Sequence, residues 1–149
     1  MLDLVLAILH HLLIFSLAGL LAAELALVRP GVGGATLKTL GLIDAGYGAT
    51  AGLILVVGFS RVFLGAKGPD FYLSNPVFWA KIAAFAVVGL LSILPTLAIL
   101  RWRKADKAQA DFTPPAAEVA RARQALLVEL AVFALIPVFA AAMARGYGF

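Results

Sequence analysis

Residues 76–100 read PVFWAKIAAFAVVGLLSILPTLAIL, a stretch that is apolar apart from Lys81 and two hydroxyl residues. It exceeds the roughly 20 apolar residues that a helix needs to cross a hydrocarbon core of about 30 Å. Asn75 and Pro76 stand where a helix start favours them, asparagine as the cap and proline at the first helical position. The stretch therefore predicts a membrane-spanning helix.

Three further apolar segments surround this one, at about residues 2–28, 37–64 and 114–144. Arg29-Pro30-Gly31 ends the first segment and Gly65-Ala66-Lys67-Gly68-Pro69 ends the second, since glycine and proline interrupt helices. Thr113-Pro114-Pro115 followed by Glu118 indicates the start of the last segment. The sequence thus predicts a single domain over residues 1–149, an all-α membrane protein. It forms an antiparallel up-down bundle of four transmembrane helices, kinked at Pro95 and Pro137, with a basic loop at about residues 101–113.

The composition supports a membrane solvent and excludes several functions. The chain is 63% hydrophobic, whereas soluble domains are about 45–50% apolar. It has no cysteine, which excludes disulfides, thiolate metal sites and cysteine nucleophiles. The first segment has no Lys or Arg before a long apolar run, so we expect a span and not a cleaved leader. HExxH, GxSxG and Gly-rich phosphate motifs are absent, which leaves no recognisable soluble-enzyme chemistry.

The basic residues predict the orientation, because cytoplasmic loops are enriched in Lys and Arg. Most of the 12 Lys and Arg residues fall in the two connections at about residues 29–38 and 101–123. We therefore expect these connections in the cytoplasm of a bacterial cell, and both termini with the 66–75 loop in the periplasm. Trp102 at one boundary, and Tyr72 and Trp79 at the other, suit interfacial aromatic belts. The basic residues 101–104 are interpreted as a topology signal near anionic headgroups, with no nucleic-acid partner.

Ionisable residues inside the spans carry the functional information, because such residues are costly in lipid and usually face the bundle interior. Spacing at seven residues predicts one polar stripe on each of three helices. The stripes are His10-Leu17-Glu24, Tyr47-Ile54-Arg61 and Glu129-Ile136-Met143.

Alternating helix directions sort these residues into two layers. The cationic layer lies in the half of the bundle that holds the termini, at the depth of Met143, and comprises His10, His11, Arg61 and Lys81. The acidic layer lies in the other half and comprises Glu24, Asp44 and Glu129. A cationic layer with imidazoles suits an anionic ligand such as a porphyrin with two propionates. An acidic layer suits protonated acids, a proton path or a cation.

Simpler interpretations stand beside these. The acids can pair with Arg29, Lys38 or Arg121 near the helix ends. Arg61 and Lys81 can extend to the membrane boundary. His10 can be a hydrogen-bonded core residue, and Met143 can fill a gap in the packing. Adjacent histidines point about 100° apart on a helix, and the chain has only 2 histidines, so bis-histidine ligation of haem iron would require a homodimer.

Three segments resemble a bacterial four-helix membrane-protein family, domain of unknown function 2214. They are Ile8-Leu9-His10-His11-Leu12-Leu13, the run from Gly58-Phe59-Ser60-Arg61 to Gly68, and Asn75-Pro76-Val77-Phe78-Trp79-Ala80-Lys81. The resemblance covers nearly the whole chain and implies no activity.

A more distant resemblance is to the HemJ-type protoporphyrinogen oxidases. Leu9-His10 in the first helix and Ala80-Lys81 in the third match pairs in that family. The resemblance implies that His10 is a haem ligand and that Lys81 holds a porphyrin carboxylate. Glu24 stands in the region where those oxidases carry a Trp and a Tyr-Leu-Pro-Arg sequence, so the resemblance implies haem or porphyrin binding more than oxidase activity.

We therefore expect a membrane protein that binds haem b or a porphyrin and is redox-active. His10 or His11 is the axial ligand, Arg61 and Lys81 hold the propionates, and Tyr47 or Met143 lines the pocket. An accessory or assembly subunit of a larger membrane complex is the first alternative. The small-residue patterns Gly48-x-x-x-Gly52 and Gly19-x-x-x-Ala23 favour close helix packing or a homodimer. A proton or small-ion pathway through Glu24, Asp44 and Glu129 is the second alternative.

Overall fold

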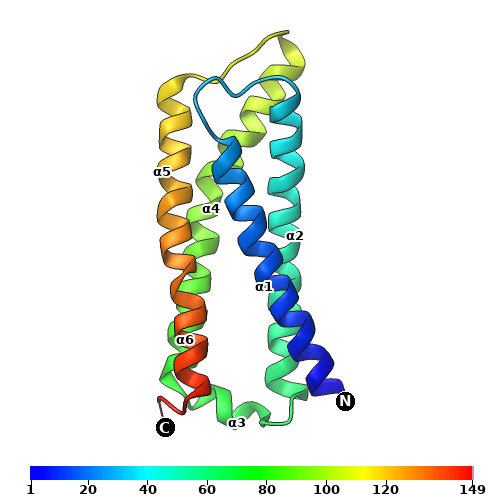
Figure 1. Cartoon of the computed structure of the whole chain (residues 1–149), viewed down its shortest axis with the longest axis vertical. Coiled ribbons are helices and arrows are strands. Elements are labelled where there is room, and N and C mark those ends of the chain that lie inside the picture. Colours follow the sequence, from blue (N-terminus) through cyan, green and yellow to red (C-terminus); the bar gives the residue numbers. More distant parts are fainter. Residues whose placement is uncertain (149) are drawn as a thin grey trace.

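Helices α1, α2, α4 and the consecutive pair α5 and α6 run up and down as four antiparallel rods in the computed structural model, which describes residues 1–148 (Figure 1). Within those residues there is no strand. The helices are α1 (Leu2–Leu27), α2 (Ala35–Leu64), α3 (Gly68–Leu73), α4 (Pro76–Ala108), α5 (Ala116–Phe133) and α6 (Leu135–Ala144). The N-terminus, the C-terminal end and α3 lie at one end of the bundle. We call this the terminal half, and the half that holds residues 28–34 and 109–115 the basic half.

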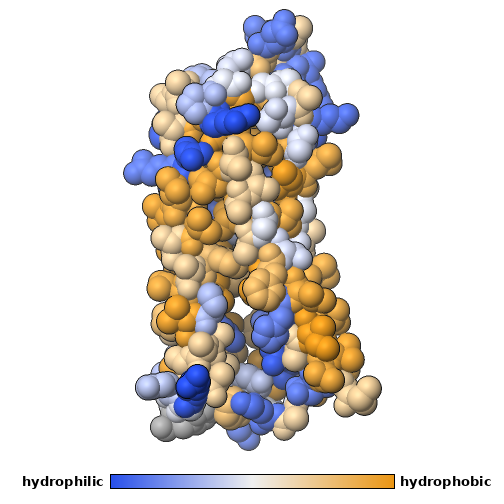
Figure 2. Space-filling model, in the orientation of Figure 1, coloured by the Kyte–Doolittle hydropathy of each residue, from blue (hydrophilic) through white to orange (hydrophobic). Residues whose placement is uncertain are grey.

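Four helical segments are long and apolar enough to cross a membrane, as the sequence predicts. Most of their surface is not buried within the chain: Phe15 is 71% exposed and Leu90 is 68% exposed. Figure 2 shows these apolar side chains along the whole length of the bundle, with hydrophilic residues gathered at its two ends. An apolar surface of this extent requires lipid around it.

The connection between α2 and α4 differs from the predicted loop over residues 66–75. It contains the short helix α3, in which Pro69 takes an early helical position that suits its fixed φ. The Asn75 cap is confirmed: its Oδ1 accepts a hydrogen bond from the Val77 amide at 2.8 Å. Its Nδ2 donates to the Tyr147 carbonyl at 3.2 Å, so one buried asparagine starts α4 and holds the C-terminal end beside it.

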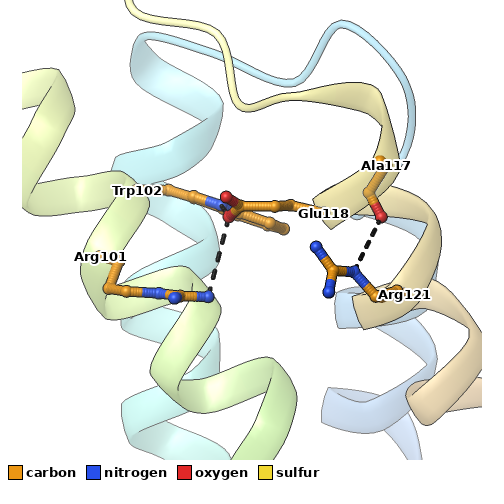
Figure 3. A network of polar contacts seen from close by, with 5 residues as sticks. All are labelled: Arg101, Trp102, Ala117, Glu118 and Arg121. Atoms are coloured by element: carbon orange, nitrogen blue, oxygen red, sulfur yellow. Dashed lines mark hydrogen bonds and ion pairs between the residues drawn. The ribbon is translucent and has the colours of Figure 1, made fainter.

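The predicted basic loop at residues 101–113 is wrong in its first part. α4 continues to Ala108, because Arg, Lys and Ala are good helix formers that do not need lipid to stay helical. Trp102 is consequently not a lipid-facing belt residue: it is 2% exposed. Its Nε1 donates to Glu118 Oε2 at 3.0 Å, and Arg101 pairs with the same oxygen at 3.7 Å, which joins α4 to α5 (Figure 3).

The two internal prolines have different outcomes. Pro95 lies within α4, which is continuous. Pro137 follows the point at which the fourth span divides, between Phe133 at the end of α5 and Leu135 at the start of α6. Proline lacks an amide hydrogen, and its ring clashes with the carbonyl four residues earlier, which is that of Phe133. The predicted kink at Pro137 is therefore a helix break.

The small-residue patterns do not pack within this chain. A side-chain carbon placed at Gly19, Gly48 or Gly52 would meet no other atom within 4 Å. Close helix packing inside the chain is therefore not their role, and a homodimer through them stays a prediction.

Neighbouring helices surround a common axis, but not equally at the two ends. α1 packs against α2 and α5, while α4 packs against α2, α5 and α6. Within residues 1–148, α1 and α6 do not contact each other. The terminal half is thus two helix pairs, α1 with α2 and α4 with α6, that stand apart on one side.

Candidate functional site

The predicted stripes face the interior, which brings the ionisable residues to the centre of the bundle. Leu17, Ile54 and Ile136, the middle residues of the three stripes, are all buried. At one end of these stripes Glu24, Tyr47 and Glu129 are also buried. The other end is formed by His10, Arg61 and Met143, which are partly buried.

The acidic layer is a network of side chains from all four rods. Tyr47 donates from its hydroxyl to Glu129 Oε1 at 2.5 Å, a bond across the bundle axis between α2 and α5. Thr96 on α4 donates to Asp44 Oδ1 at 2.6 Å. Glu24 on α1 lies within electrostatic range of both Asp44 and Glu129. Two carboxylate oxygens, Glu24 Oε1 and Glu129 Oε2, are buried without a hydrogen-bond partner.

No basic side chain forms an ion pair with these acids in the described part of the chain. Over residues 1–148 the one ion pair is Arg101 with Glu118, outside the layer. Arg121, one of the partners that the sequence offers, instead donates from its Nε to the Ala117 carbonyl at 3.4 Å (Figure 3). The simpler interpretation, in which cations at the helix ends neutralise the acids, is therefore not what the structure forms.

Arg123, like Arg121, binds backbone carbonyls and not the acids of the layer. Its Nη1 donates to the carbonyls of Leu25 and Val28 at 2.7 and 3.0 Å. These carbonyls end α1 and have no amide of a following turn to bind. The guanidinium therefore closes the basic half by joining α5 to the end of α1, above the acidic layer.

The cationic layer gathers His10, Arg61 and Lys81, from α1, α2 and α4 respectively. Arg61 and Lys81 both lie within electrostatic range of His10. His10 Nδ1 and Arg61 Nε are buried without a hydrogen-bond partner. Lys81 Nζ lies 5.2 Å from the centre of the Phe78 ring. Among residues 1–148 it forms no ion pair with a carboxylate. Buried donors and charges are normally paired, so the two buried nitrogens of His10 and Arg61 keep an unmet hydrogen-bonding capacity.

The imidazole of His10 lies against α2 at Gly58. A side-chain carbon at position 58 would lie 3.3 Å from His10 Cε1, closer than most side-chain contacts allow. Glycine at this position therefore lets the ring sit against the helix backbone. The sequence prediction did not include Gly58, and its position three residues before Arg61 is the signal that could have found it.

One side of the bundle has an opening. It lies in the terminal half, between α1 and α6, the two neighbouring helices that do not contact each other. Figure 2 shows the molecule hollowed at this place, with hydrophilic atoms in the hollow between apolar surfaces.

Of the other predicted ligand-binding residues, His11 and Tyr47 lie elsewhere, and Met143 lies in the terminal half. His11 is on the exposed face of α1, and its Nδ1 is 2.7 Å from the Ala7 carbonyl of the same helix. Tyr47, predicted to line the pocket with Met143, belongs to the acidic layer through its bond to Glu129. Met143 packs against the cluster of Val62, Tyr72 and Phe78 in the terminal half. Thr96, which no sequence argument selected, completes the acidic layer.

Metal binding by protein side chains alone finds no support. Over residues 1–148, no group of three or more His, Asp or Glu side chains could hold a metal ion. A single histidine with open positions is nevertheless sufficient for haem, because the porphyrin supplies the equatorial nitrogens and the protein supplies the axial ligand.

The family described as "predicted membrane protein (DUF2214)" has a model that matches residues 2–148, so the chain belongs to this family. No curated protein matches the chain, and no solved structure matches it. The resemblance to the HemJ-type oxidases stays a prediction.

Proposed function

We propose that this member of the family binds haem b or a porphyrin in the opening between α1 and α6. The observation that carries the proposal is a set of three basic side chains, His10, Arg61 and Lys81, that form no ion pair with a carboxylate among residues 1–148. His10 and Arg61 each also have a buried nitrogen without a hydrogen-bond partner. An anionic ligand would satisfy them together. Because this site lies in the bilayer, the ligand must also be compatible with lipid, which a porphyrin is.

Each residue then has a distinct role. Arg61 and Lys81 hold the two propionates, Arg61 as a planar donor and Lys81 as a compact charge. If the porphyrin contains iron, His10 would hold that iron through its imidazole, and the iron would supply redox chemistry. Met143 lines the apolar wall beside Phe78. His11 faces outward and has no part in the site.

The orientation of the site is part of the proposal. If the positive-inside preference sets the topology, the termini are periplasmic, the membrane is the bacterial inner membrane, and the opening lies in its outer half. Cysteine accessibility at introduced positions near residues 67 and 110 would test this, since only the terminal end would react with an impermeant reagent added to spheroplasts.

Titration of the purified protein in nanodiscs tests the binding. We expect haemin and iron-free protoporphyrin each to bind at one site, detected by the change in porphyrin absorbance. Arg61→Gln and Lys81→Gln should each weaken both ligands about tenfold, the effect of losing roughly 1.4 kcal/mol of charge-assisted binding.

The two histidines provide a matched pair for the same titration. His10→Ala should weaken haemin more than protoporphyrin, because only haemin has iron to coordinate, while His11→Ala should affect neither ligand. Binding that is absent in the wild type, or that is lost equally in the two histidine variants, would refute the proposal.

A further inference from the structure

The acidic layer takes no part in porphyrin binding, although burying it is costly. Glu24, Asp44 and Glu129 come from three different helices and are all at least nine-tenths buried. In the bilayer an unpaired charge of this kind is strongly unfavourable, and such residues mark ion or proton pathways. The layer therefore needs a function of its own.

The contacts within the layer show what it lacks. Tyr47 and Thr96 each supply one hydroxyl proton, which accounts for one oxygen of Glu129 and one of Asp44. Glu24 Oε1 and Glu129 Oε2 have no donor at all. These two oxygens are nearly inaccessible, and they belong to side chains that lie within electrostatic range of each other.

No basic side chain, including Lys38 of α2, forms an ion pair with these acids among residues 1–148. On α5, Arg123 is bound to the carbonyls that end α1. On α4, Arg103 packs over Gly41 of α2, and it forms no ion pair with an acid in the described chain. α1 contributes Glu24 as its one ionisable residue at this depth. A metal ion is not expected either, since residues 1–148 contain no group of His, Asp or Glu side chains that could hold one.

We propose that the acidic layer is a proton-binding site, in which Glu24 and Glu129, beside Asp44, hold protons within the membrane and exchange them with each other and with solution. A proton taken up converts one carboxylate into a carboxylic acid, whose O–H can then bind an oxygen of a neighbouring acid. Release reverses the step, and no oxidant or reductant is involved. Tyr47 fixes the position of Glu129 by donating to its other oxygen.

The arrangement also separates the proton site from the ligand site. Leu17, Ile54 and Ile136, all buried, lie along the stripes between the acidic and cationic layers. They form an apolar section that holds no titratable group of those stripes. The proton-binding proposal therefore does not depend on the porphyrin proposal.

Infrared difference spectroscopy of the ligand-free protein in lipid bilayers tests the inference. Near neutral pH we expect a carbonyl band of protonated carboxylic acid, which shifts in D2O. Glu24→Gln and Glu129→Gln should each remove part of this band, and Tyr47→Phe should move it, because the hydrogen bond to Glu129 is lost. Glu118→Gln is the control, since Glu118 is paired with Arg101 outside the layer and should leave the band unchanged.

The wild-type spectrum alone decides the matter if a variant fails to fold. Absence of a protonated carboxyl band at neutral pH would overturn the inference, as would a band that persists in full in the Glu24→Gln, Glu129→Gln and Asp44→Asn variants. The same measurement on His10→Ala separates the two sites: we expect the band to be retained there even though haemin binding is weakened.

Discussion

The two halves of this bundle use the same four rods in opposite ways. In the basic half the helices close around buried acids, and Arg123 and Trp102 link neighbouring helices at the end. In the terminal half α1 and α6 separate, and basic groups lie beside the opening. The difference shows that the same three polar stripes can be enclosed at one end of the bundle and open at the other.

The origin of the difference lies in two local features. The fourth span divides at Ala134, three residues before Pro137, and α6 contacts α4 and α5 but not α1 among residues 1–148. In the basic half, Arg123 binds the carbonyls at the end of α1. In the terminal half, one side-chain hydrogen bond among the described residues joins α1 to the rest of the chain: Asp3 Oδ1 accepts from the Ala66 amide at 3.4 Å. The basic half is thus the closed half, whose contacts hold the bundle together. The terminal half is the open half, where we propose that the ligand binds.

Removing a core side chain from the closed half should have the largest effect. Leu126 is 0% exposed, whereas its neighbour Leu127 is 48% exposed. We expect Leu126→Ala to lower the free energy of unfolding by about 2–5 kcal/mol, because the removed atoms leave a void. Leu127→Ala faces lipid and should change it little. Unfolding in mixed micelles with increasing SDS measures both, and equal effects would contradict the assignment of the closed core.

Loss of the Arg123 contacts should come next. Arg123→Ala leaves the carbonyls of Leu25 and Val28 without their donor, which we expect to cost about 2 kcal/mol. Hydrogen exchange should also increase at the end of α1. Arg121→Ala is the matched control, since Arg121 binds a carbonyl of its own helix and its loss should leave both measurements near wild type. Unchanged exchange in Arg123→Ala would mean that the closed half is held by other contacts.

A substitution beside His10 should affect the open half without affecting stability. Gly58→Val places atoms where the imidazole lies, and we expect haemin affinity to fall about tenfold, equivalent to about 1.4 kcal/mol. Gly52→Val, at a position with nothing within 4 Å, should leave affinity unchanged. The titration described for haemin measures both variants, and a normal affinity in Gly58→Val would show that His10 is not positioned by α2.

The smallest effect is expected at the end of the open half. Asn75→Ala removes the cap of α4 and the bond to the Tyr147 carbonyl, and should reduce stability by about 1 kcal/mol. Ser74→Ala, whose hydroxyl binds the Asp70 carbonyl of its own turn, should cost less. Unfolding in SDS compares them, with protease sensitivity of the C-terminal end as a second measurement. A larger loss in Ser74→Ala would contradict the role of Asn75.

The sequence predicted those features that depend on one helix at a time. The four spans follow from composition, the Asn75 cap follows from two adjacent residues, and the buried stripes follow from spacing at seven residues. These properties are local, and the structure confirms them. The division of the stripes into acidic and cationic layers followed from helix direction alone.

Features that depend on how two helices meet were not predictable in the same way. Trp102 was expected at the membrane boundary as an interfacial belt residue. Its burial could not be predicted from its own helix, because it depends on the position of Glu118 on α5. The separation of α1 from α6 depends on helix tilt, which no residue in either helix encodes alone. Tyr47 follows Asp44 by three residues and so lies on the same face of α2, about one turn away. This spacing was a signal that Tyr47 belongs to the acidic layer. Its partner Glu129 could not be identified, because the two helices face each other only across the bundle axis.

The central claim, that the open half binds a porphyrin through its basic groups, is tested most directly by the visible absorption spectrum of the protein purified from haem-replete membranes. The account predicts a Soret band in the wild type and in His11→Ala, and a shifted or weakened band in His10→Ala. A fully expressed, folded wild-type protein without a Soret band, from membranes whose other haem proteins are occupied, would contradict it.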